Sequence, residues 1–152
     1  MSDYFKNINE IIYEGPDSDN PLSFKYYDEN RQVLGKTMKE NLRFATCYWH
    51  TFTWPGLDPF GGATFERPWM SSGDPLKMAE MKLDEAFDFF NKVKTPFFCF
   101  HDRDISPEGS NYKETQKNFF HIINLMESKM ETSNIKLLWG TANAFSHKRY
   151  MS

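Results

Sequence analysis

Three short apolar segments, separated by two stretches of helical periodicity, constrain this sequence more than any other feature. The apolar segments span residues 43–54, 97–100 and 136–139, and the near-continuous apolar and aromatic character of the first favours a central strand buried on both faces. Each intervening stretch is long enough to return the chain for parallel pairing. The order predicts an α/β fold in which all three strands end at the same end of one sheet.

The two helical stretches carry their own start and stop signals. Asp74 and Pro75 supply an N-cap and a proline at the first helical position, and apolar residues then recur at spacings of three and four. The second stretch begins after Asn111, which together with Glu114 resembles a capping box, and it ends at Asn134. We expect two amphipathic helices with their apolar faces on the sheet.

The residues before the first apolar segment contain turn signals and no sustained apolar period. We predict a surface arm or short ribbon that closes with a compact helix at residues 38–42. The chain therefore divides into an arm, residues 1–42, and a strand and helix region, residues 43–152.

Composition excludes several classes of protein. A net charge of -3, with acids and bases mixed along 152 residues, argues against a nucleic-acid partner. No leader-like segment and no run of about 20 apolar residues is present, so we expect a cytoplasmic protein without a membrane partner. Cys47 and Cys99 lie in apolar segments and are interpreted as buried free thiols. The 15 Phe, 7 Tyr and 4 Trp indicate a chain built to pack against a large surface.

His101 and Asp104 are the strongest catalytic candidates from the residues alone. A histidine at the end of a buried strand can donate one ring N–H to a carboxylate three residues later and present its other nitrogen to a substrate. Such a pair suits proton movement between two sugar oxygens. The alternative is a loop histidine capped by a turn aspartate, and Asp102 with Arg103 could form a structural ion pair.

Aromatic and small polar residues follow the strands. Flat apolar rings there can stack on the C–H faces of a sugar, although core packing is the alternative; the candidates are Trp49, Trp54, Phe60, Trp139 and Phe145. Thr141 and Asn143 offer polar groups at the same rim but are also common turn formers. His121 lies in a helical pattern, which favours a structural role. No cluster has convincing spacing for a divalent metal, and no phosphate-binding loop is present.

Several long blocks resemble the larger bacterial-type xylose isomerases along nearly the whole chain. They are YEGPDSDNPLSFKYY (residues 13–27), CYWHTFTWPGLDPFGG (47–62), FERPW (65–69), PFFCFHDRD (96–104) and LLWGTANAFSHKRYM (137–151). Lys148 stands where that family usually has proline. An epimerase or endonuclease relative with the same fold is a weaker reading of these blocks.

The resemblance implies a metal-dependent aldose-ketose isomerase on a (β/α)8 barrel, converting D-xylose to D-xylulose and often glucose to fructose. His101 then corresponds to the group that opens the cyclic sugar, and Asp104 to its orienting partner. The remaining correspondences are Trp49, Trp139 and Phe145 in the apolar wall, Thr141 at a position that affects substrate size, and Phe60 reaching into a neighbouring subunit of a homotetramer.

The same resemblance implies two divalent cations, magnesium, manganese or cobalt, whose ligands come from later strands that this chain lacks. A barrel of this kind takes about 200 to more than 400 residues. We therefore expect a partial TIM barrel, the first three strands and their helices from the N-terminal portion of such an enzyme, inactive in isolation. The alternative is a non-catalytic remnant that associates with another chain.

Overall fold

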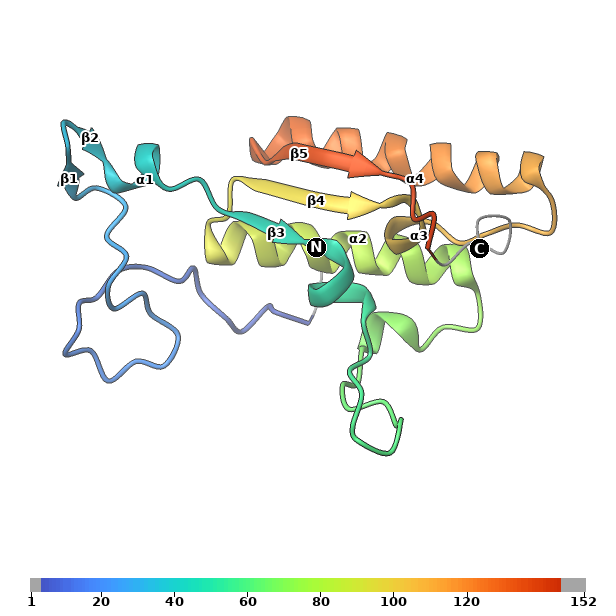
Figure 1. The fold of residues 1–152 in the computed structure, drawn as a ribbon, viewed down its shortest axis with the longest axis horizontal. Helices are drawn as coiled ribbons and strands as arrows, with labels where there is room; N and C mark the ends of the chain where they lie inside the picture. Colours follow the sequence, from blue (N-terminus) through green and yellow to red (C-terminus); the bar gives the residue numbers. More distant parts are fainter. Residues whose placement is uncertain (1–3, 146–152) are drawn as a thin grey trace.

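A three-stranded parallel sheet lies at the centre of the computed structural model, which describes residues 4–145 (Figure 1). Its strands are β3 (Ala45–Cys47), β4 (Phe97–His101) and β5 (Lys136–Thr141), in the order β3-β4-β5. This confirms the predicted α/β fold with a parallel sheet. The prediction of a central first strand is wrong, because β4 lies between the other two and β3 is at an edge.

The first strand is also much shorter than predicted. It ends at Cys47, and the chain turns into a π-helix, η1 (Trp49–Thr53), in which the Trp54 N–H donates to the Trp49 carbonyl oxygen at 2.7 Å. Tyr48 and Phe52 are both buried. A short apolar run does not by itself distinguish a strand from a buried helical turn. Here the two buried residues, Tyr48 and Phe52, are four positions apart, which is the spacing of one helical turn.

The two long helices agree with their sequence signals. Helix α2 (Pro75–Val93) begins at Asp74, whose carboxylate accepts two backbone N–H groups, and ends at Lys94 in the left-handed region. Helix α4 (Tyr112–Ser133) begins at Asn111 and ends at Asn134. Its capping box is incomplete, since the Glu114 carboxylate bonds to Ser110 rather than to the Asn111 N–H.

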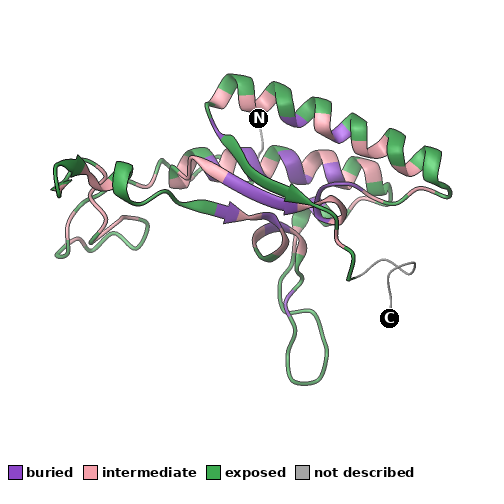
Figure 2. Cartoon of the chain, turned by 45° about the horizontal axis from the view of Figure 1, so that its top comes forward, coloured by how far each residue is buried: buried purple, intermediate pink, exposed green. Residues whose placement is uncertain are grey.

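Both long helices pack on one face of the sheet (Figure 2). Phe98, fully buried on β4, stacks on Phe90 of α2 at 5.3 Å between ring centroids. Ile122 and Met126 bring α4 into the same core. By contrast, β5 is exposed along its whole length. No helix of residues 4–145 is long and apolar enough to cross a membrane.

Short elements complete the chain. The arm holds β1 (Gln32–Val33), β2 (Lys36–Thr37) and α1 (Met38–Asn41), while η2 (Pro68–Met70) and α3 (Asp102–Ile105) precede the two long helices. Strands β1 and β2 form an antiparallel ribbon, and α1 agrees with the predicted compact helix. Both cysteines are free, with Cys99 buried and Cys47 half-buried.

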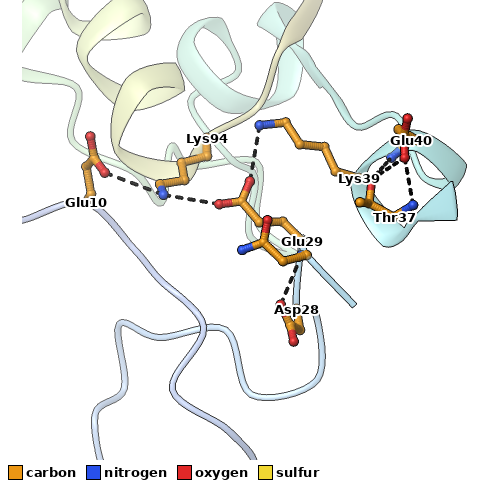
Figure 3. A network of polar contacts seen from close by, with 8 residues as sticks. Glu10, Asp28, Glu29, Thr37, Lys39, Glu40 and Lys94 are labelled. Carbon is orange, nitrogen blue, oxygen red and sulfur yellow. Dashed lines mark hydrogen bonds and ion pairs between the residues drawn. The ribbon is translucent and has the colours of Figure 1, made fainter. Parts of the chain in front are cut away.

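An ion-pair network ties the arm to the end of α2 (Figure 3). The Glu29 carboxylate lies 3.2 Å from Lys39 Nζ and 3.4 Å from Lys94 Nζ, and Lys94 Nζ is also 3.6 Å from Glu10. Hydrogen bonding to Lys39 is the main cause that lowers the pKa of Glu29. These contacts hold the arm at the amino end of the sheet. The division of the chain into an arm, residues 1–42, and a strand and helix region, residues 43–152, stays a prediction.

Candidate functional site

His101 and Asp104 meet at the carboxyl end of the central strand. His101 is the last residue of β4, and Asp104 follows on α3. One carboxylate oxygen of Asp104 accepts the His101 backbone N–H at 2.9 Å and lies 3.0 Å from Nδ1 of the same residue. Asp104 is buried, whereas the imidazole is half-buried. The carboxylate can therefore fix the ring while Nε2 remains available for another contact.

Two tryptophans from the neighbouring segments border this imidazole. The Trp49 ring centroid lies 4.8 Å from that of His101 and 5.5 Å from that of Trp139, and the His101 and Trp139 centroids are 5.7 Å apart. Trp139 is 40% exposed, so it does not belong to the core of the described residues. Three segments far apart in sequence thus bring one imidazole and two indole rings into mutual contact, a cluster of Trp49, His101 and Trp139 that we call the aromatic rim.

Polar contacts join the ends of β4 and β5 beside the aromatic rim. Thr141 is paired in register with His101, and Asp102 accepts the backbone N–H of Asn143 at 2.8 Å. The ion pair between Asp102 and Arg103, left open by the sequence, does not form. Arg103 instead lies 3.4 Å from Glu108, because the Asp102 carboxylate is engaged by backbone N–H groups.

Phe60 and Phe145 are not brought into the aromatic rim. Phe60 is 96% exposed at the tip of a loop, where the Asp58 carboxylate accepts the N–H groups of Phe60 and Gly62. Phe145 is 89% exposed.

The other aromatic and histidine candidates lie elsewhere. Trp54 packs against Phe65. His121 contacts Glu80 at 2.6 Å and so links α4 to α2. His147 and Lys148 lie outside the described residues.

Two side chains behind the aromatic rim were not predicted from the sequence. Lys82 of α2 is buried, and its Nζ donates to the Thr53 hydroxyl at 3.3 Å. Burial lowers the pKa of Lys82 to about 8, although the Asp104 charge acts in the opposite direction. One signal could have revealed this lysine, because it stands on the apolar stripe of α2 between Ala79 and Ala86.

Tyr48 also lies close to this buried charge. It is fully buried at the end of β3, and its pKa is raised by burial and then by the charge of Asp104.

Within residues 4–145, no group of three or more histidine, cysteine or acidic side chains could hold a metal ion. The arrangement offers an imidazole with a carboxylate partner and a hydrophobic wall, which suits proton transfer on a small polar molecule.

Three curated relatives are similar to this chain over nearly its whole length. No protein-family model matches the chain. The xylose isomerase of Photobacterium profundum is 58% identical over 152 residues, which is 100% of this chain and 35% of the relative. That of Paraburkholderia phytofirmans is 58% identical over 147 residues, 97% of the chain and 33% of the relative. That of Roseobacter denitrificans is 52% identical over the whole chain and 35% of the relative. The chain spans about a third of the length of the curated relatives it matches.

Proposed function

The chain belongs to the xylose isomerase family, and from this premise we propose that it supplies the ring-opening half of a site that converts D-xylose to D-xylulose. The single observation that carries the proposal is the His101 imidazole, held by Asp104 and bordered by Trp49 and Trp139. The relatives compared above are all named xylose isomerase. Their names favour this reaction over that of an epimerase or endonuclease relative. Glucose is a second substrate of the proposed enzyme.

The proposed role of His101 is a proton transfer within the cyclic sugar. The imidazole takes the proton from the hydroxyl group on C1, and that oxygen forms the C1 carbonyl as the bond between C1 and the ring oxygen breaks. The imidazolium then gives the proton to the ring oxygen. Atoms and charge balance without an external acid or base. The Asp104 carboxylate stabilises the transient imidazolium and keeps the ring oriented.

The other candidate residues have proposed roles in substrate contact. Trp49 and Trp139 form an apolar wall for the C–H face of the sugar, and Phe145 extends it. Thr141, in register with His101, limits substrate size. Phe60 reaches the site of a neighbouring subunit in a homotetramer, a role that its position at an exposed loop tip supports.

The family uses two divalent cations, magnesium, manganese or cobalt, that polarise the open-chain sugar. The described residues do not fit such a site, since they contain no cluster of three candidate ligands. We propose that the ligands belong to other parts of the complete polypeptide. The step assigned to His101 and Asp104 does not run through the cations.

The sheet is proposed to be the first three strands of a (β/α)8 barrel in the cytoplasm. Strands β3 and β5 each have one edge without a partner in the described sheet, and no helix of residues 4–145 covers the face opposite α2 and α4 (Figure 1). Further parallel strands at these edges would continue the same pattern.

Split complementation tests the proposed function. We expect the purified chain with xylose and magnesium to form no xylulose above background. Mixing it with the complementary two thirds of the Photobacterium profundum relative should restore conversion. The relative's own corresponding segment is the positive control, and the His101→Asn chain is the negative control. Xylulose from the chain alone would contradict the expected inactivity. Equal conversion with the His101→Asn chain would contradict the catalytic role.

A non-catalytic association role is the second candidate, and two surfaces favour it. Strand β5 is exposed throughout, and an apolar groove of about 590 Å³ runs beside β3, lined in part by Phe44, Ala45 and Phe89. Exposed apolar strand edges favour association with another chain. Size-exclusion chromatography separates the candidates. A monomer that melts cooperatively and gains activity on complementation counts against a purely associative role.

A further inference from the structure

Two charged side chains are buried in residues 4–145, and they have opposite signs. Lys82 is 8% exposed and Asp104 is 5% exposed. A buried charge is costly unless a partner offsets it. The two groups influence each other electrostatically, because the Asp104 charge raises the pKa of Lys82 against the larger effect of burial. The buried lysine and the buried aspartate therefore belong to one electrostatic unit.

Thr53 connects the two buried groups. Lys82 Nζ donates to the Thr53 hydroxyl at 3.3 Å, and that hydroxyl donates to the Asp104 backbone carbonyl at 3.3 Å. Lys82 stands on α2, Thr53 ends η1 and Asp104 lies on α3. The threonine thus joins three elements directly behind the imidazole.

Two further titratable side chains feel the charge of the Asp104 carboxylate, namely Tyr48 and Cys99. Burial raises the pKa of Tyr48 and of Cys99, and the negative charge of Asp104 raises both further. The phenol and the thiol therefore stay neutral and do not offset the charge of Asp104. The titratable groups that face this buried pair come from the end of β3, from β4 and from α2: Tyr48, Cys99, His101 and Asp84. Lysine 129 of α4 pairs with Asp84 at 2.6 Å. The ammonium of Lys82 is thus the buried cation that balances Asp104.

We propose that Lys82 is a positioning residue for His101: its ammonium, anchored on the Thr53 hydroxyl that bonds to the Asp104 backbone, holds Asp104 so that its carboxylate stays directed at the imidazole. This inference deepens the proposed function and rests on it for its catalytic meaning. Its physical content, the coupling between Lys82 and the His101 ring, requires no substrate.

The charge state of Lys82 changes at an accessible pH. Its pKa of about 8 lies well below the ordinary value of 10.5. The ammonium is therefore present at pH 7 and absent at pH 10. The His101 ring, which contacts Asp104 directly, should register this change through the carboxylate.

Nitrogen-15 NMR of the histidine rings tests the coupling in the full 152-residue chain. The His101 signals are assigned by their loss in His101→Asn. In the parent chain we expect the ring nitrogen shifts to pass through an inflection near pH 8. Lys82→Met should lack the inflection and should show at pH 7 the shifts that the parent reaches above pH 9. An absent inflection in the parent, or parent-like shifts in Lys82→Met at pH 7, would overturn the proposal.

Two further variants make the test independent of folding in Lys82→Met. Lys82→Arg keeps its positive charge across this range, so it should retain the pH 7 shifts of the parent and lose the inflection. Lys77→Met removes an exposed lysine from the same helix and should reproduce the parent titration. An inflection that persists in Lys82→Arg assigns it to another group and rejects Lys82. Failure of the xylose reaction leaves these spectra unchanged, so the two proposals fail separately.

Discussion

A single carboxylate oxygen of Asp104 serves both the backbone N–H and the Nδ1 atom of His101, at 2.9 and 3.0 Å. The backbone contact caps the first turn of α3, and the ring contact orients the imidazole. The turn cap and the proposed catalytic pair, the two interpretations left open by the sequence, therefore depend on the same carboxylate oxygen. A substitution of Asp104 would disturb both, so the histidine is the better target for separating structure from chemistry.

Substitution of His101 by Asn in a complete isomerase tests the ring-opening role. We expect turnover of cyclic xylose to fall by about 10²- to 10⁴-fold, the usual contribution of general acid-base catalysis. An open-chain analogue bypasses this step and should lose far less. Steady-state kinetics on both substrates measures the difference. An equal loss on both substrates would show that His101 acts elsewhere in the reaction.

The ionisation of Lys82 predicts an unusual pH dependence of stability. The pKa of Lys82 falls from 10.5 in the unfolded chain to about 8 in the folded one, so between these values the unfolded chain binds the extra proton. The free energy of unfolding should therefore rise with pH across this window. Below pH 8 the buried ammonium costs roughly 3 kcal/mol, and the cost disappears towards pH 10.5.

Comparison with Lys82→Met isolates this contribution. Urea unfolding of both chains from pH 7 to 10.5 should show the parent gaining stability relative to the variant, by up to roughly 3 kcal/mol. The difference cancels the titration of Cys99 and Tyr48, whose pKa values are raised in the folded chain and which oppose the trend at high pH. A constant difference would indicate that Lys82 is not buried as an ammonium.

Local signals explain why much of the fold was predictable. Asp74 and Asn111 cap the N-termini of their helices through hydrogen bonds to residues no more than three positions away. Asn134 ends the second helix in the left-handed region. The pairing of His101 with Asp104 was accessible for the same reason, since both lie on one turn. Predictions of this kind depend on neighbours in sequence.

The features that the sequence did not predict depend on contacts between residues far apart in sequence. The first strand ends at Cys47 because the next turn packs Phe52 into the core and because Trp69, beyond a long loop, donates to the Phe52 carbonyl. The burial of Lys82 beside Asp104 likewise needs α2 and α3 to pack together. No local pattern specifies either contact, although a lysine on an apolar stripe is a usable warning.

Substitution of Trp69 by Phe tests whether the loop holds η1 in place. The indole N–H donates to the Phe52 carbonyl oxygen at 2.9 Å, and both residues are buried. Removal of the donor leaves that carbonyl without this partner, at an expected cost of about 1–3 kcal/mol in the free energy of unfolding. Urea denaturation measures the loss. Trp54→Phe is the matched control, because Trp54 is 44% exposed and its substitution should change stability by less than about 0.5 kcal/mol. Equal losses would refute a specific role for Trp69.

The lack of a side chain at Gly140 leaves room for the Phe100 ring of the central strand. Gly140 is paired in register with Phe100, and a Cβ atom at Gly140 would lie 2.9 Å from the Phe100 ring. Gly140→Ala should therefore displace the buried Phe100 ring and reduce the free energy of unfolding by about 1–3 kcal/mol. Gly73→Ala is the control, since a Cβ atom there meets nothing within 4 Å. Because Trp139 precedes Gly140, the strained variant should also change the fluorescence of the aromatic rim. Wild-type stability in Gly140→Ala would show that the Phe100 ring shifts without cost and that the space beside Gly140 is not needed for core packing.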